Sequence, residues 1–261
     1  YGGGEGSIRQ VIEHELIGRH KEALVDKEGS GLARLLDDNK VEDLRRMYDM
    51  FARVKGGAEL LEDRVAAYCG QKGRDIVQSP ENLADHGQYV ARLLDLKELH
   101  DRLVRDAFRG EKGFVNKVNR AFVDFVNLCP RSPEFISLAM DSYLRGAKAG
   151  KQADARAASE EQLEGQLEKC LQLFRFVSEK DMFEKYYKGH LARRLLNDRS
   201  QSDDMERKVI QLLKTECGYQ FTAKLEGMFK DMNTSKDIQE RFSQHRAAAA
   251  DAEDGGGGGG V

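Results

Sequence analysis

The chain has 261 residues, of which 40% are hydrophobic and 33% charged, so it holds enough apolar material for one large or two modest domains. Basic and acidic residues nearly balance, at 42 against 45, and the formal net charge of -3 argues against bulk affinity for nucleic acid or another polyanion. The four cysteines lie far apart and form no paired CxxC spacing, so neither a disulfide framework nor a zinc site is predicted.

The chain contains no apolar run near the roughly 18 residues that a membrane-spanning helix needs. We therefore expect no membrane partner. Its first residues, YGGGEGS, include neither an initiator Met nor the basic and apolar segments of a secretion signal. We expect a fragment of a longer protein from a reducing, intracellular setting.

Apolar residues recur at spacings of three and four almost everywhere, and only three prolines interrupt them, which predicts an all-α fold. The first helix is expected over residues 7–28. A second should follow Asn39, whose side chain would cap it while Glu42 completes a capping box. A third helix is expected over residues 59–71 and should stop at Gly73.

Two further helices are predicted over residues 88–108 and 114–128, and short links between such helices favour antiparallel neighbours. The stretch CPRSPEF then marks the clearest boundary in the chain. Pro130 bars the preceding helix from continuing, while Ser132 as N-cap and Pro133 in the first turn should start the next one.

The second half begins, after that helix, with a small, polar and basic stretch that is typical of a mobile loop. Helices are then expected over residues 160–178, over 180–196, from an N-cap at Asp203 to residue 217, and from Thr222 onward. Residues 247–261 have almost nothing to bury, which predicts a disordered tail. We thus predict two helical parts, residues 1–129 and 130–246, followed by this tail.

Residues 180–196, with the sequence KDMFEKYYKGHLARRLL, are predicted to form an amphipathic helix. An apolar stripe advances by four through Phe183, Tyr187, Leu191 and Leu195, is widened by Met182 and Tyr186, and is expected to be bundle core. Arg193 and Arg194 fall on the other flank with Lys188. We interpret the two arginines as a solvated face or as partners for local carboxylates, each exposed pair contributing at most about 1 kcal/mol.

We find no sequence motif for phosphate binding, dinucleotide binding, a nucleophile elbow, a zinc protease or an EF-hand. The six histidines are scattered, and His190 stands alone in an aromatic stripe. Asp203 and Asp204 begin a predicted helix, where capping explains them better than catalysis does. The sequence therefore predicts no catalytic residue, no metal site and no cofactor.

Several stretches resemble the cullin family, and the resemblance extends from about residue 8 to residue 245. They are ELIGRHKEALV, GLARLLDDNKVEDLRRMYDMFARV, SPEFISLAMDSYLR, KDMFEKYYKGHLARRLL and LLKTECGYQFTAKLEGMF. Within the family they are most similar to the cullin type that works with BTB-domain adaptors. The resemblance implies that residues 1–129 are the third helical repeat of the stalk and that residues 130–246 are the four-helix bundle of the cullin homology region.

Cullins are scaffolds of ubiquitin ligases, so the resemblance implies a non-catalytic spacer in ubiquitin-dependent protein degradation. Its implied partners are a RING-box protein, BTB-domain substrate adaptors and a ubiquitin-conjugating enzyme, all through the full-length protein, in the cytoplasm and nucleus. The loop after the first bundle helix contributes, in the family, to a basic groove for the acidic tail of some conjugating enzymes. Arg145, Lys148 and Lys151 occupy that loop here.

Two alternatives stay open on the sequence alone. The chain could be a helical-repeat interaction module without a role in ubiquitin transfer. It could also be a helical nucleic-acid binder that uses Lys188, Arg193 and Arg194, although the balanced charge and the lack of interleaved exposed aromatic residues count against this second alternative.

Overall fold

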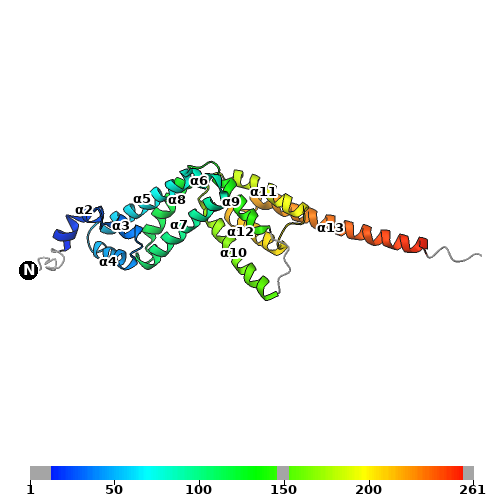
Figure 1. Cartoon of the computed structure of the whole chain (residues 1–261), viewed down its shortest axis with the longest axis horizontal. Coiled ribbons are helices and arrows are strands. Elements are labelled where there is room, and N and C mark those ends of the chain that lie inside the picture. The colour runs from blue at the N-terminus through cyan, green and yellow to red at the C-terminus, as the bar shows by residue number, and fades with distance from the viewer. Residues whose placement is uncertain (1–12, 146–152, 255–261) are drawn as a thin grey trace, which may run out of the picture. The chain divides into compact units, whose positions relative to one another are not determined.

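A computed structural model describes residues 13–145 and 153–254 of the chain. Figure 1 shows that these two stretches consist of helices joined by short connections, which confirms the predicted all-α fold. Within the same residues the only extended pairing is an isolated antiparallel bridge between Arg145 and Ser200. None of the helices described there is long and apolar enough to cross a membrane.

The chain divides into two compact units. Among the described residues, the first unit contains 13–139 and 172–180, and the second contains 140–145, 153–171 and 181–254. The first unit thus continues past the predicted boundary at residue 129, because the residues after Pro130 pack against Tyr89. The rings of Tyr89 and Phe135 lie 5.0 Å apart, and the Tyr89 hydroxyl donates to Ser132 Oγ at 2.6 Å, which itself donates to the Val126 carbonyl.

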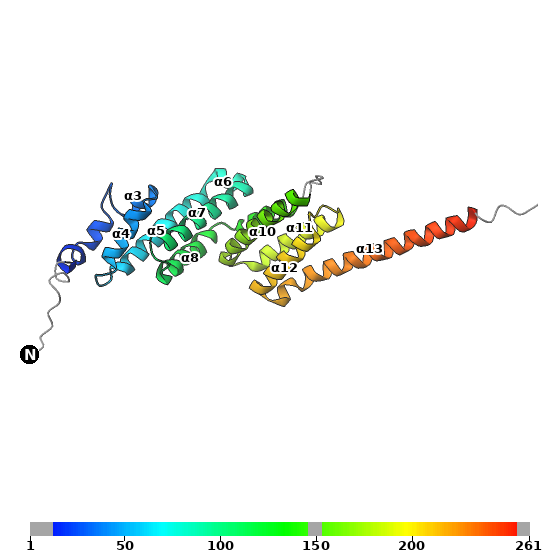
Figure 2. The same cartoon turned by 90° about the horizontal axis from the view of Figure 1, so that it is seen from below.

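The predicted single helix over residues 7–28 is wrong: in the described residues 13–28, two short helices, η1 and α2, take its place. The helices that lie wholly in the first unit are joined by short connections. They are η1 (His14–Gly18, a π-helix), α2 (Lys21–Val25), α3 (Leu32–Asp37), α4 (Val41–Phe51), α5 (Gly57–Gln78), α6 (Pro80–Ala84), α7 (His86–Asp106) and α8 (Lys112–Val126). Figures 1 and 2 both show α5, α7 and α8 running alongside one another.

The predicted capping box at Asn39 is also wrong. Asn39 adopts a left-handed conformation, with φ of 51°, and Lys40 precedes α4 as an N-cap without a side-chain hydrogen bond. The Asn39 side chain instead accepts a hydrogen bond from Arg102 at 3.2 Å. Asparagine tolerates the left-handed region better than most residues, which suits it to this turn.

Gly73 does not end a helix, contrary to the prediction, since α5 continues to Gln78. A Cβ atom at Gly73 would lie 2.3 Å from two ring carbons of Phe125 in α8. Such a distance is far inside van der Waals contact, so only glycine lets the two helices approach this closely. The glycine that suggests a helix stop in the sequence is therefore a packing device between α5 and α8.

Among the described residues, five helices contribute to the second unit, and parts of α9 and α10 and the first residue of α11 belong to the first unit. The five helices are α9 (Ser132–Leu144), α10 (Ala153–Phe176), α11 (Lys180–Leu196), α12 (Asp203–Cys217) and α13 (Tyr219–Asp254). The bounds predicted for α11 are confirmed. The cap predicted for α12 is wrong by one residue, because Ser202 accepts the Met205 N–H at 3.5 Å.

The predicted disordered tail over residues 247–261 is wrong for residues 247–254, because helix α13 continues to Asp254. Its residues 247–250 are four consecutive alanines, the residue with the highest helix propensity, and that preference favours continuation of the helix. Residues 255–261 lie outside the described part of the chain. Ile238 and Phe242 on this helix are 62% and 65% exposed.

Candidate functional site

Helix α11 separates a buried face from an exposed one, and the apolar part of that prediction is confirmed. Phe183, Tyr187 and Leu191 are fully buried, whereas the other predicted members of the stripe, Met182, Tyr186 and Leu195, are only partly buried. Arg193 is exposed, as expected, but Arg194 is 0% exposed and lies on the buried face. The interpretation of Arg194 as a residue on a solvated surface is therefore wrong, although the expected pairing with carboxylates is present.

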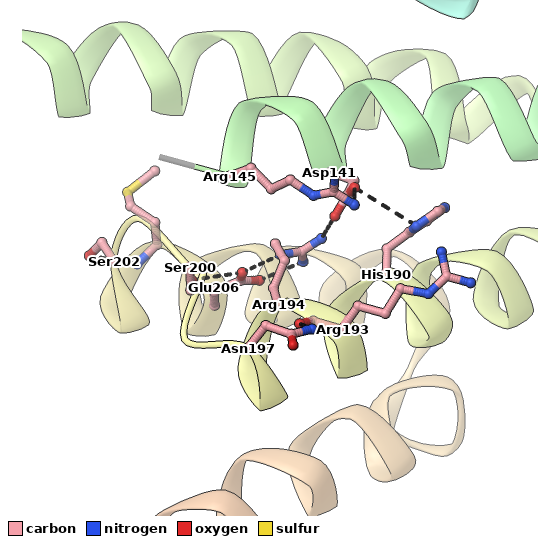
Figure 3. Close-up of polar contacts among 10 residues, drawn as sticks. Asp141, Arg145, His190, Arg193, Arg194, Asn197, Ser200, Ser202 and Glu206 are labelled. Atoms are coloured by element: carbon pink, nitrogen blue, oxygen red, sulfur yellow. Dashed lines mark hydrogen bonds and ion pairs between the residues drawn. The ribbon is translucent and has the colours of Figure 1, made fainter. Parts of the chain in front are cut away.

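Arg194 is held by two carboxylates from two other helices, and Figure 3 shows it between them. Its Nε donates to Glu206 Oε1 at 2.6 Å, and its Nη2 donates to Glu206 Oε2 at 2.9 Å, which makes a bidentate pair. Its Nη1 forms a short hydrogen bond with Asp141 Oδ1. The side chains of Glu206 and Asp141 are 0% and 4% exposed, so water hardly reaches either pair.

The protonation of this cluster follows from its geometry. Burial alone would lower the pKa of the Arg194 guanidinium, but the hydrogen bonds and negative charge of Glu206 outweigh burial and raise that pKa above its ordinary value. Arg194 thus stays charged. Burial first, and then the negative charge of Glu206, raise the pKa of the neighbouring Tyr187 phenol, so that group stays neutral.

A buried arginine between two carboxylates is not an efficient source of stability, because desolvation of the three charges opposes their attraction. Removing one partner is nevertheless costly, since it leaves a buried charge without compensation. The cluster therefore fixes one arrangement of α9, α11 and α12. Its remaining negative charge is balanced by Arg145, whose Nη2 lies 2.7 Å from Asp141 Oδ2.

Arg145 ends the described part of the chain before residue 146, and it is tied to the connection between α11 and α12. It forms the bridge with Ser200, and the Gln201 N–H donates to the Leu144 carbonyl at 3.0 Å. Ser200 Oγ donates to Glu206 Oε1 at 2.9 Å, so this connection is also tied to the buried cluster. The cluster thereby holds the point at which the predicted basic loop begins.

The structure describes one of the three predicted site residues, Arg145. The side chain of Arg145 is 45% exposed, and its charge is partly neutralised by Asp141. Lys148 and Lys151 lie outside the described residues. Whether the three cations share one surface therefore stays a prediction.

The structure bears on two other expectations from the sequence. Within residues 13–145 and 153–254, no three His, Cys, Asp or Glu side chains are grouped so that they could hold a metal ion. The buried position of Arg194 removes one of the three cations offered for nucleic-acid binding, because a fully buried guanidinium cannot reach a phosphate.

Sequence reasoning missed the buried cluster, although a signal for it was present. Arg194 follows Tyr187 by seven positions, which is two helical turns, so the periodicity places it on the apolar face. Glu206 lies three positions after the predicted N-cap at Asp203, a spacing that favours a capping role. It is instead 0% exposed and bound to Arg194.

Comparison with known proteins gives a consistent picture. Residues 4–239 match the family model described as the Cullin alpha solenoid domain. The chain is 47% identical over 241 residues to Cullin-3 of Dictyostelium discoideum, which covers 92% of this chain and 30% of that protein. It is 47% identical over 233 residues to Cullin-3B of Arabidopsis thaliana, covering 89% of this chain and 31% of that protein.

Cullin-4A of Homo sapiens is also similar, at 42% identity over 242 residues, which covers 92% of this chain and 30% of that protein. Its identity is lower than that of the two Cullin-3 proteins. The chain spans about 30% of the length of these relatives.

Proposed function

The chain belongs to the cullin family, and on that premise we propose that it is the middle part of the scaffold subunit of a cullin-RING ubiquitin ligase. In this role it spaces a substrate adaptor from the module that carries activated ubiquitin. The observation that carries the proposal is the family match over residues 4–239, with higher identity to the two Cullin-3 proteins than to Cullin-4A.

The physical advantage of a spacer is entropic. Two reactants held on one scaffold meet at a high effective concentration, which lowers the barrier to transfer without any catalytic group on the scaffold itself. Tight packing supports this role, because an element that bends easily would spread the distances between the bound partners. The closely packed α5 and α8 and the buried Arg194 cluster each resist such bending within their own unit.

The finer assignment of partners is also part of the proposal. We propose that the full-length protein binds a RING-box protein, BTB-domain substrate adaptors and a ubiquitin-conjugating enzyme. The similarity to Cullin-3 proteins supports the choice of the BTB type of adaptor. A cytoplasmic and nuclear location stays a prediction.

The test of these partners is a reconstitution with the full-length protein. Size-exclusion chromatography with light scattering should detect one complex that contains the scaffold, the RING-box protein and a BTB adaptor. Ubiquitin transfer to a substrate on that adaptor should require all three components. Failure of the full-length protein to bind the RING-box protein would contradict the ligase role. It would favour the alternative, a helical-repeat interaction module that has no role in ubiquitin transfer.

The same proposal gives Arg145, Lys148 and Lys151 the role of attracting the acidic tail of a conjugating enzyme. Charges of this kind mainly raise the association rate, and salt screens their effect over about 10 Å at 0.1 M ionic strength. Because Asp141 already pairs with Arg145, the two lysines should contribute more of the attraction than Arg145 does.

The measurement is the association rate of the acidic tail with the full-length protein as ionic strength increases. The triple variant R145Q/K148Q/K151Q should bind more slowly at low salt and lose most of the salt dependence. Arg120, an exposed cation of the first unit, provides the matched control as R120Q. Identical salt slopes for the wild type and the triple variant would remove the three residues from the site.

A further inference from the structure

His190 is a buried histidine that the proposed function does not use. It is 8% exposed, and neither of its ring nitrogens has a hydrogen-bond partner. Its Nδ1 lies 3.8 Å from Asp141 Oδ2, which is too far for a hydrogen bond but close enough for a small rotation of the ring to make one.

The oxygen that faces His190 is already in use. Asp141 Oδ1 accepts from the buried Arg194, while Oδ2 is paired with Arg145 at 2.7 Å. Figure 3 shows Arg145 and His190 approaching Asp141 from different sides. Arg145 and a protonated His190 would therefore be two cations at one carboxylate oxygen, and the positive charge of each opposes the binding of the other.

We propose that His190 is a proton-dependent competitor of Arg145, so that its protonated ring takes Asp141 Oδ2 and releases the Arg145 side chain. The cluster then has two arrangements. In the first, His190 is neutral and Arg145 is held on Asp141. In the second, the His190 imidazolium donates to Asp141, and Arg145 extends from the end of α9 toward solvent.

The charged groups around His190 decide when the second arrangement forms. Asp141 of α9 and Arg145, directly after that helix, face His190. Arg193 and Arg194 follow His190 on α11, and Glu206 of α12 is bound to Arg194. Burial lowers the pKa of His190, Asp141 opposes this effect, and the three arginines add to it, so the pKa lies below its ordinary value of 6.5. The first arrangement thus prevails at neutral pH, and the second forms under acidic conditions.

The competition is reciprocal, as for any two ligands of one site. If Arg145 weakens protonation of His190 by some factor, then protonation of His190 weakens the hold on Arg145 by the same factor. Arg145 is among the cations to which we assign attraction of an acidic tail, and this consequence rests on the proposed function. The competition itself concerns the cluster alone.

The test is an NMR titration of the whole 261-residue chain that follows the His190 ring and the Arg145 Nε–H as the pH falls. In the wild type, both signals should change with the same apparent pKa. In R145Q, the oxygen is vacated, so the pKa of His190 should rise. R193Q is the matched control, because Arg193 also repels a charged His190 but makes no pair with Asp141.

Competition predicts that R145Q raises the pKa of His190 by at least about 0.5 more than R193Q does, which is a threefold difference in proton affinity. Repulsion alone predicts that R193Q has an equal or larger effect, and that result would overturn the proposal. H190Q should abolish the pH dependence of the Arg145 signal. If the melting curve shows that H190Q does not fold, the comparison of R145Q with R193Q still tests the proposal. Both arginines are exposed, so these two variants should fold.

The acidic-tail measurement can fail without affecting this result, since the titration needs no partner. Conversely, equal effects of R145Q and R193Q would remove the competition while leaving the scaffold proposal untouched. A pH-independent Arg145 signal in the wild type would also contradict the release of Arg145.

Discussion

Arg194 and Glu206, on consecutive helices of the second unit, form a bidentate ion pair from which solvent is excluded on both sides. The pair is extended by Asp141, which lies 53 positions from Arg194 in the sequence. Such a cluster fixes one arrangement of three helices, because separating them would take buried charges away from their partners.

The first prediction contrasts two adjacent arginines. Arg194→Ala leaves the buried Glu206 without a cation and removes one of the two cations of Asp141, so it should lower the free energy of unfolding by about 3–5 kcal/mol. Arg193→Ala should cost under about 1 kcal/mol, because that side chain is exposed. Urea unfolding of both variants gives the comparison, and equal losses would mean that α11 has been assigned the wrong buried face.

The second prediction concerns the contact between α5 and α8. Gly73→Ala places a methyl group against the Phe125 ring, so it should destabilise the first unit by about 1–3 kcal/mol through overpacking. Gly189→Ala in α11 is the control, since a Cβ there meets no atom within 4 Å.

In an open helical position, alanine is favoured over glycine by about 0.5–1 kcal/mol. Gly189→Ala should therefore raise the melting temperature while Gly73→Ala lowers it. If Gly73→Ala also raised the melting temperature, α5 and α8 could not pack as closely at Gly73 and Phe125 as the structure shows.

The third prediction is a loss of stability under acidic conditions. His100 is fully buried, its Nδ1 contacts the Leu96 carbonyl at 2.9 Å, and its Nε2 has no partner. Burial lowers the pKa of His100, and the Leu96 carbonyl and Asp101 only partly oppose that effect. His190 shows a shift in the same direction.

A histidine with a lowered pKa binds fewer protons when folded than when unfolded, so its stabilising effect is present above the unfolded value of about 6.5 and is lost as the pH falls through the folded value. The urea midpoint should thus decrease from about pH 7.5 to pH 5.5. His100→Leu should flatten this decrease, whereas His20→Gln, at an exposed position, should leave it unchanged. A His100→Leu profile as steep as that of the wild type would show that His100 does not contribute.

The helical part of this fold follows from local information. The spacing of Phe183, Tyr187 and Leu191 is enough to predict α11 at its observed bounds, because periodicity is a property of neighbouring residues. The roles of Arg194 and Gly73 depend instead on partners in other helices. No local pattern indicates that Gly73 faces the Phe125 ring or that Glu206 binds a buried arginine.

The fourth prediction concerns the end of the chain. Residues 233–246 of α13 are exposed throughout, so this part of the helix contributes little packing to the second unit. Truncation after Arg246 should shift the melting temperature by less than about 2 °C, because the residues removed are mainly alanine and glycine with little apolar surface to bury. A loss of several degrees would mean that the removed residues pack against the unit.

The scaffold role is tested most directly by varying the amount of the full-length protein while its adaptor-bound substrate and its RING-box module are kept fixed and limiting. A scaffold joins the two partners at low concentration but distributes them over separate molecules when it is in excess. With a scaffold, the initial rate of ubiquitin transfer should rise to a maximum and then fall as more of the protein is added. A rate that rises to a plateau, or one that does not depend on the protein at all, would contradict the scaffold role.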